Sequence, residues 1–307
     1  MPWLLRRLLG VVPTLFITWT IVFAVLQFIP GDPVMLALGG TPASDEVIRN
    51  ERARLGLDRP IHEQYLTFLR KMATGDLGTS YQQRQPVARI IAEQLPHSAA
   101  LAAGGLLVGL ILGVALGIFA GVRPHGWADT ATMSLALIGV SLPSFWIGMM
   151  LIYVFGTMLE WVPILGDGID ALILPSITVG LFLAGGLARM IRSAIIETMS
   201  QDYIRTAHAK GLSAFRIVAK HAMRNAVIPP ITLLGVQFAF LIGGAVVTER
   251  VFARQGLGTL LIEAVLTKDV PLVQGLVVYT TSAYIIVNLL IDMLYGVVDP
   301  RIRAARA

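Results

Sequence analysis

Six apolar runs constrain this 307-residue chain most strongly, because each is long enough to cross a lipid bilayer as a helix. They cover residues 8–29, 99–122, 131–158, 174 to about 195, 226–248 and 272–298. Hydrophobic residues make up 55% of the chain and charged residues only 14%, with a mean hydropathy of +0.73. The sequence therefore predicts an all-α, polytopic membrane protein with six transmembrane helices and both termini on one side.

The first apolar run follows Arg6 and Arg7, as the core of a secretory signal peptide would. It has 22 residues, and no small-residue cleavage pattern precedes Gly31. These two features favour a signal-anchor helix that is retained.

The positions of lysine and arginine predict which side of the membrane each loop occupies. Segments on the N-terminal side hold 13 of these residues, seven of them between Arg189 and Arg224, whereas the two short opposite loops hold three. The positive-inside rule therefore places both termini and the polar insert at 196–225 in the cytoplasm. The net charge of +5 reflects this topology and does not indicate a nucleic-acid surface.

The segment after the first run is predicted to be a small external helical domain. Between Asp32 and His97 it carries eight basic and eight acidic residues, and it is too long for the charge rule to apply. Capping and helix-stop residues predict three short helices, at 44–56, 60–73 and 86–95. We expect Ser44 to cap the first helix, Gly56 and Gly75 to end the first two, and Pro96 to break the third.

The second apolar run carries a glycine at every fourth position. These residues are Gly105, Gly109, Gly113, Gly117 and Gly121. Every fourth residue lies near one face of a helix, so the pattern favours close packing within the chain or against a partner subunit. The alternative is the ordinary enrichment of glycine in transmembrane helices.

Polar residues inside the other runs are few. Ser141 and Ser144 flank Pro143 near the middle of the third run, where we expect their hydroxyls to satisfy carbonyls freed by the proline. Asp292 lies one turn after Asn288 in the last run. Asp292 is predicted to form an ion pair with a residue such as Arg189 or Arg192, with a ligand or gate role and a proton relay as alternatives.

Signatures of catalysis are missing from the sequence. There is no GxxxxGK[ST] phosphate loop, no HExxH motif and no cysteine, and the serines within the membrane lack a base at their depth. We therefore expect no catalytic residues, no bound cofactor and no metal on this chain. If the chain takes part in an ATP-driven process, another chain must hydrolyse the ATP.

The polar insert reads as a helix, a stop and a second helix between Asp202 and Pro229. We expect Gly211 to adopt a left-handed conformation, Ser213 to cap the second helix, and Pro229 to mark the start of the next apolar helix. Its apolar candidates for contact are Tyr203, Ala207, Leu212, Phe215 and Val218, and its charges are Arg205, Lys210, Arg216, Lys220 and Arg224. Such a helix can fill a groove on a cytoplasmic partner, or lie on anionic lipid.

This insert resembles the cytoplasmic Glu-Ala-Ala loop of ABC importer permeases, in the form found in the oligopeptide/dipeptide and nickel branch. The glycine of the family pattern falls at Gly211, so Arg205, Thr206 and Ala207 occupy the Glu-Ala-Ala positions, and only Ala207 matches. The RTAxAKG form is common in the peptide branch. Further motifs follow in the family's order: PGDP at 30–33, GLDxP at 56–60, GDLG at 75–78, ExVFxxxGLG at 249–258, and the signature of Asn288, Asp292, Tyr295 and 299–303.

The resemblance implies the first-permease (B-type) subunit of a type I ABC importer in the bacterial plasma (inner) membrane. Its implied partners are a homologous second permease, two cytoplasmic ATPase subunits that carry ATP and Mg²⁺, and an external solute-binding protein. The coupling loop would comprise Arg205, Thr206, Ala207, Lys210, Gly211, Leu212, Ser213 and Phe215. Relatives carry peptides, nickel chelates, haem or glutathione, so the solute stays open.

The alternative is a self-sufficient secondary transporter driven by an ion gradient. That class predicts inverted repeats and several ionisable residues at the membrane midplane. This chain has one cytoplasmic insert and one aspartate of that kind. The importer interpretation divides the chain into 1–30 (tip and first helix), 31–97 (external domain), 98–300 (permease core) and 301–307 (cytoplasmic tail).

Overall fold

A computed structural model describes residues 2–28, 32–38, 43–166, 168–213, 216–223 and 228–298. These residues form helices and connecting turns, apart from one isolated antiparallel bridge between Thr79 and Pro86. The chain divides into two compact units, one made of residues 1–97, 242–244 and 255–307 and the other of 98–241 and 245–254.

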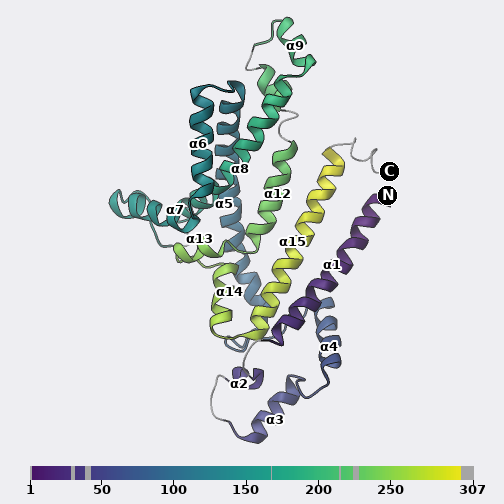
Figure 1. Cartoon of the computed structure of the whole chain (residues 1–307). Helices are drawn as coiled ribbons and strands as arrows, with labels where there is room; N and C mark the ends of the chain where they lie inside the picture. The colour runs from purple at the N-terminus through teal and green to yellow at the C-terminus, as the bar shows by residue number, and fades with distance from the viewer. Residues whose placement is uncertain are drawn as a thin grey trace. The chain divides into compact units, whose positions relative to one another are not determined.

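The first unit combines the N-terminal third of the chain with its C-terminal end (Figure 1). Its helices are α1 (Pro2–Leu26), α2 (Pro33–Ala37), α3 (Asp45–Arg54), α4 (Ile61–Ala73), α14 (Leu257–Leu266) and α15 (Val270–Val298). Helix α1 runs antiparallel along α15, and α4 joins them through a cluster of Val22, Phe68, Met72 and Val278. The hydroxyls of Thr20 and Tyr65, 2.7 Å apart, add a polar link between α1 and α4.

The predicted caps of the external segment are confirmed. The Ser44 hydroxyl accepts from the Val47 N–H at the start of α3, and Gly56 and Gly75 have φ of +71° and +75° after α3 and α4. Only glycine adopts such backbone angles without strain, so these positions stop the helices. Short helix α2 was not predicted; the Asp32 side chain caps it by accepting from the Val34 N–H at 3.0 Å.

The predicted break at Pro96 is wrong. One helix, α5 (Val87–Val122), runs through this proline, so the expected third external helix is the first part of a longer one. A proline inside a helix loses one hydrogen bond and costs about 3 kcal/mol. Packing outweighs that cost, because Val87, Ile90 and Ile91 are buried against Leu257, Leu260 and Leu276.

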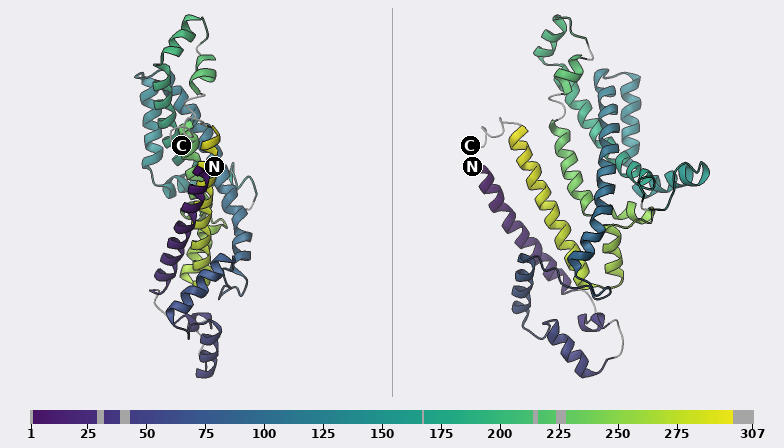
Figure 2. Two further views of the ribbon diagram at one scale, coloured as in Figure 1. Left: turned by 90° about the vertical axis from the view of Figure 1, so that its right-hand side faces the viewer. Right: turned by 180° about the vertical axis from the view of Figure 1, so that it is seen from behind.

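The second unit contains the remainder of α5 together with the central helices. These are α6 (Trp127–Ser141), α7 (Ser144–Leu151), the π-helix η1 (Ile152–Met158), α8 (Ile173–Met199), α9 (Asp202–Ala209), the π-helix η2 (Ile217–Ala222), most of α12 (Ile228–Ile242), and α13 (Val246–Val251). Helices α5, α6 and α8 stand side by side in all views, and α7 turns away from them (Figure 2).

Two predicted spans differ from single straight helices. The run 131–158 is bent by 102° between α6 and the α7–η1 segment, because Leu142, which precedes Pro143, takes extended angles with ψ 137°. The run 226–248 ends its helix at Ile242. Gly244 follows with φ +105° and lies against the backbone of Gly258, which leaves no room for a side chain.

The described residues support part of the predicted count of six spans. Helices α5 and α8 and residues 270–291 of α15 are long and apolar enough to cross a membrane, and the bent pair makes a fourth if it counts as one span. Shorter apolar stretches occupy residues 9–25 of α1 and 233–242 of α12. The structure therefore shows a mostly helical protein with three or four candidate spans.

Candidate functional site

Helix α9 is the centre of the polar insert, and it follows α8 after a two-residue turn. Its inner side is built from Ile204 and Ala207, which pack with Ile217 of η2 and are almost fully buried. Met199 at the end of α8 and Leu212 cover this cluster. The insert is therefore a small packed unit that extends beyond the end of α8 (Figure 1).

The end of α9 has the hydrogen bonds of a Schellman motif. Gly211 has φ +75°, its N–H donates to the His208 carbonyl at 2.9 Å, and the Leu212 N–H donates to the Ala207 carbonyl at 3.3 Å. The Ser213 hydroxyl then accepts from the Arg216 N–H at 3.4 Å. The predicted left-handed Gly211 and the predicted cap at Ser213 are both confirmed.

The outer side of the insert is mainly cationic. Its exposed side chains include Tyr203, Arg205, Thr206, Lys210 and Arg216. Arg205 lies 3.6 Å from the Asp202 carboxylate, but both side chains are largely exposed, so this pair leaves the arginine accessible.

Several residues expected to contact a partner are buried within this chain or lie outside the described residues. Ala207 and Val218 are buried in the chain's own packing, and Leu212 is half-buried. Phe215, Arg224 and the side chain of Lys220 lie outside the described residues. Among the described residues, the exposed surface of the insert is therefore more polar than the sequence pattern suggests.

The five glycines of α5 face α8 along a line that we call the glycine seam. They oppose, in order, Val179, Leu183, Leu187, Ile191 and Ile195. A Cβ built on each glycine would lie 2.5–3.0 Å from its opposing side chain, and at the first four the distance is shorter than real Cβ contacts allow. The pairs advance in the same direction in both helices, so α5 and α8 run parallel and end on the same side.

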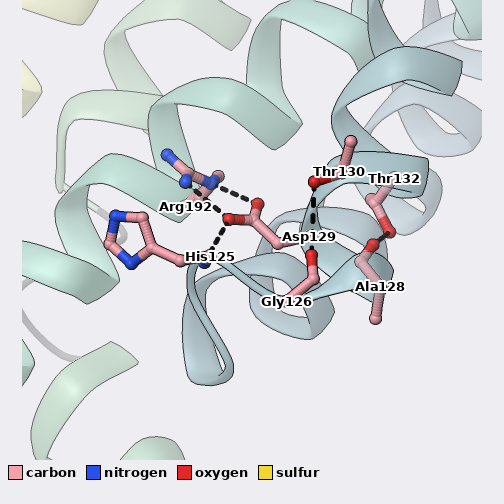
Figure 3. A network of polar contacts seen from close by, with 7 residues as sticks. All are labelled: His125, Gly126, Ala128, Asp129, Thr130, Thr132 and Arg192. Atoms are coloured by element: carbon pink, nitrogen blue, oxygen red, sulfur yellow. Dashed lines mark hydrogen bonds and ion pairs between the residues drawn. The ribbon is translucent and has the colours of Figure 1, made fainter.

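An ion pair missed by the sequence analysis lies near the ends of these helices. Asp129 in the first turn of α6 is 5% exposed and accepts from Arg192 of α8 through both oxygens, at 2.5 Å from Nε and 2.7 Å from Nη2 (Figure 3). The His125 backbone N–H also donates to Asp129, at 2.9 Å. Two parallel bonds to a guanidinium fix orientation as well as distance.

This pair involves one of the residues named as a possible partner of Asp292. Arg192 is bound to Asp129 in the structure, and the ion pair predicted for Asp292 stays a prediction. The signal in the sequence was weak, because the predicted span began at residue 131 and left Asp129 in the preceding loop. Asn288 is half-buried on α15, and the side chain of Asp292 lies outside the described residues. A pathway role for these two residues stays a prediction.

A second missed carboxylate organises the first unit. Asp269 is fully buried before α15 and accepts from the Ser80 hydroxyl at 2.5 Å and from the backbone N–H groups of Tyr81, Gln82 and Leu272 at 3.1–3.3 Å. Burial and the nearby carboxylate raise the pKa of Tyr81 to about 12, so its phenol stays protonated at neutral pH. This network ties the segment after α4 to the start of α15.

No group of three or more His, Asp or Glu side chains with the arrangement of a metal site occurs in the part of the chain that the structure describes. The polar clusters above consist instead of carboxylates satisfied by hydrogen-bond donors of the same chain. Their chemistry suits the positioning of helices.

Comparison with known proteins places the chain in a family. Residues 113–304 match the model for the binding-protein-dependent transport system inner membrane component, and residues 1–102 match the model for the N-terminal part of such membrane components. The glutathione transport system permease protein GsiC of Escherichia coli O6:H1 is 41% identical over 302 residues, which cover 98% of both chains. The protein of the same name from Salmonella typhi has the same identity and coverage.

A solved structure shares the fold. A chain from the inward facing conformations of the MetNI methionine ABC transporter aligns with a TM-score of 0.52 and 20% identity, covering 68% of this chain and 96% of that chain. The matched models, the relatives and the helical fold agree. This chain belongs to the family of binding-protein-dependent transport system inner membrane components, and it is a permease subunit of an ABC importer.

Proposed function

We propose that this subunit forms half of a translocation pathway for glutathione or a similar small peptide, and that α9 is where separate ATPase subunits drive it. A homologous permease would form the other half, and an external binding protein would deliver the solute. The sequence supports this division of labour, because the chain contains no phosphate-binding loop.

The observation that carries the proposal is that α9 is packed against the rest of the insert on one face and exposes cationic side chains on the other. Its inner face is buried on Ile204 and Ala207, its end is fixed by the Gly211 motif, and its outer face presents Arg205 and Lys210. A helix held in this way can transmit a push from a partner as a rigid body, without bending. Because α5 and α8 run parallel, α9 and the loop after α5 follow the same ends of these two helices, which supports placing both on one side of the membrane.

The distribution of charge supports a cytoplasmic position for that side. The segment between Arg189 and Arg224, which includes the end of α8, holds seven lysine and arginine residues, the largest number in any segment on the N-terminal side. Under the positive-inside rule this loop and both termini face the cytoplasm, where the ATPase subunits would dock.

Charge reversal on α9 tests the docking role. We expect the variant Arg205→Glu/Lys210→Glu to lose most of its ATPase subunits during purification, because charge complementarity across an interface governs association. The stoichiometry of the purified complex measures this, and binding should weaken at least about tenfold.

The matched control reverses two exposed arginines of the external segment, Arg49→Glu/Arg59→Glu. It makes the same change in net charge and should retain the ATPase subunits. If the α9 variant keeps its ATPases at the level of this control, the docking proposal is wrong.

The solute proposal rests on the relatives, whose names assign them to glutathione transport. We expect the complete importer in proteoliposomes to accumulate radiolabelled glutathione when ATP and the cognate binding protein are present. Unlabelled dipeptides and tripeptides in excess distinguish a glutathione system from a general peptide system. Uptake driven by an ion gradient without ATPase subunits would contradict the proposal.

A further inference from the structure

We propose that Asp129 and Arg192 are positioning residues that set the register between α8 and the α5–α6 pair, so that displacement of α9 moves all three helices together. This inference rests on the proposed coupling role of α9. The ion pair would then transmit movement between helices, which differs from only stabilising the fold.

The glycine seam by itself defines its register poorly. Glycines recur every four residues on α5, and the opposing apolar residues recur every four residues on α8. A shift of α8 by four residues, about 6 Å along the axis, would place most of these side chains opposite another glycine. The α5 glycines taken alone therefore allow neighbouring registers of similar packing. Gly180 and Gly185 of α8 add contacts that do not repeat, since a Cβ there would lie 2.5 Å from Val108 and even closer to the Ala136 carbonyl oxygen, respectively.

The ion pair adds a polar contact that favours the same single register. Asp129 has the Arg192 guanidinium on both oxygens and the His125 N–H on one of them, so it accepts a fixed set of donors (Figure 3). A slip of one turn would separate the charges by several ångströms and leave a carboxylate that is 5% exposed without its partner. Removing one partner of a buried pair is strongly unfavourable, and fixing register is the best-attested use of such pairs.

The pair also lies near the end of the glycine seam, close to the contact between α8 and α9. The carbonyl of Arg192 is 3.2 Å from a Cβ built on Gly121, the last glycine of the seam. Seven residues later, Met199 packs both on the cluster of Ile191 and Ile195 and on the cluster of Ile204 and Ile217. The helix that carries Arg192 is thus in direct contact with α9 at its end.

The polar contacts around Asp129 reach back to α5. His125 and Gly126 form the turn between α5 and α6, and His125 has φ +65°. The hydroxyls of Thr130 and Thr132 donate to the carbonyls of Gly126 and Ala128, four residues earlier, so they leave the Asp129 carboxylate to Arg192 and His125 (Figure 3). One carboxylate therefore joins α6 and the turn after α5 to α8.

The test uses the complete importer in proteoliposomes with two readouts. The first is the amount of solute transported per ATP hydrolysed. The second is the distance distribution between spin labels on cysteines introduced at two exposed positions, Ile111 on α5 and Phe182 on α8, in an importer whose other subunits carry no reactive cysteine; this chain has no native one. A residue that only stabilised the fold would change neither readout in the complex that assembles.

We expect Asp129→Asn to keep its ATPase subunits and to hydrolyse ATP, while transport per ATP falls about tenfold, within the usual range of coupling between sites. The spin-label distribution should broaden or split. The control Glu93→Gln removes the carboxylate of an exposed ion pair with Arg89 and should match the unmodified chain in both readouts.

If Asp129→Asn does not assemble, Arg192→Lys decides the question, since lysine keeps the charge but loses the two-pronged geometry. An unchanged ratio of transport to hydrolysis, or a lowered ratio with an unchanged distance distribution, overturns the register proposal. Failure of the coupling role itself would appear separately, as ATPase subunits retained by the α9 charge-reversal variant.

Discussion

The variant Gly117→Ala is expected to lower the stability of the assembled permease by about 2 kcal/mol, the cost of overpacking a filled interior. The added Cβ would lie 2.7 Å from Ile191 Cβ and 2.8 Å from the Ala188 carbonyl oxygen. The carbonyl belongs to the backbone of α8, so a rotamer change cannot relieve the contact and the two helices must separate. Thermal unfolding in detergent, followed by size-exclusion chromatography, measures the effect.

The matched control is Gly10→Ala, which adds the same methyl group to another apolar helix. Nothing lies within 4 Å of a Cβ at Gly10, and alanine is the better helix former by about 0.5–1 kcal/mol. We expect this control to unfold at the same temperature as the unmodified chain or higher. Equal destabilisation by both variants would show that the glycine seam is not closely packed.

The helix ends of the insert and the external segment could be predicted from the sequence because their causes are local. Ser44, Gly56, Gly75 and Gly211 act through hydrogen bonds and backbone angles that involve residues within one turn. Such signals do not depend on the rest of the fold. The structure therefore confirms the cap and the helix ends predicted at these residues.

The two prolines show where local reasoning stops. Pro96 was expected to break a helix and does not, whereas Pro143 was expected within one span and coincides with a bend of 102°. Proline disfavours a continuous helix at both positions. Packing of Val87 and Ile91 keeps the helix intact around Pro96, while after Pro143 the next helix leaves α6 and packs Gly148 against Val251 and Phe252. The outcome depends on contacts far away in the sequence.

The candidate site shows the same difference between local and long-range signals. The exposed Arg205 and Lys210 and the stop at Gly211 follow from the pattern of the insert, but the partners of Asp129 and Asp269 are 63 and up to 189 residues distant. A single aspartate near the end of an apolar run carries no signal about which arginine it meets. Long-range polar pairs therefore needed the structure.

The variant Asp269→Ala is expected to destabilise the first unit by at least about 3 kcal/mol. It removes the acceptor for the Ser80 hydroxyl and for three backbone N–H groups, and each buried donor left unsatisfied costs about 1–3 kcal/mol. It also removes the cap and the negative charge at the start of α15, both of which favour the helix. Thermal unfolding of the assembled complex and limited proteolysis between α4 and α5 measure the loss.

The conservative variant Asp269→Asn separates the causes. Asparagine keeps one oxygen acceptor but replaces the other with a donor that faces the Ser80 hydroxyl or a backbone N–H, so we expect an intermediate loss. The control Asp58→Ala removes an exposed carboxylate from the external segment to which Asp269 binds and should leave unfolding unchanged within about 0.5 kcal/mol. Equal behaviour of Asp58→Ala and Asp269→Ala would mean that the buried network does not hold the external segment to α15. The graded order would instead identify satisfied hydrogen bonding as the force that joins them.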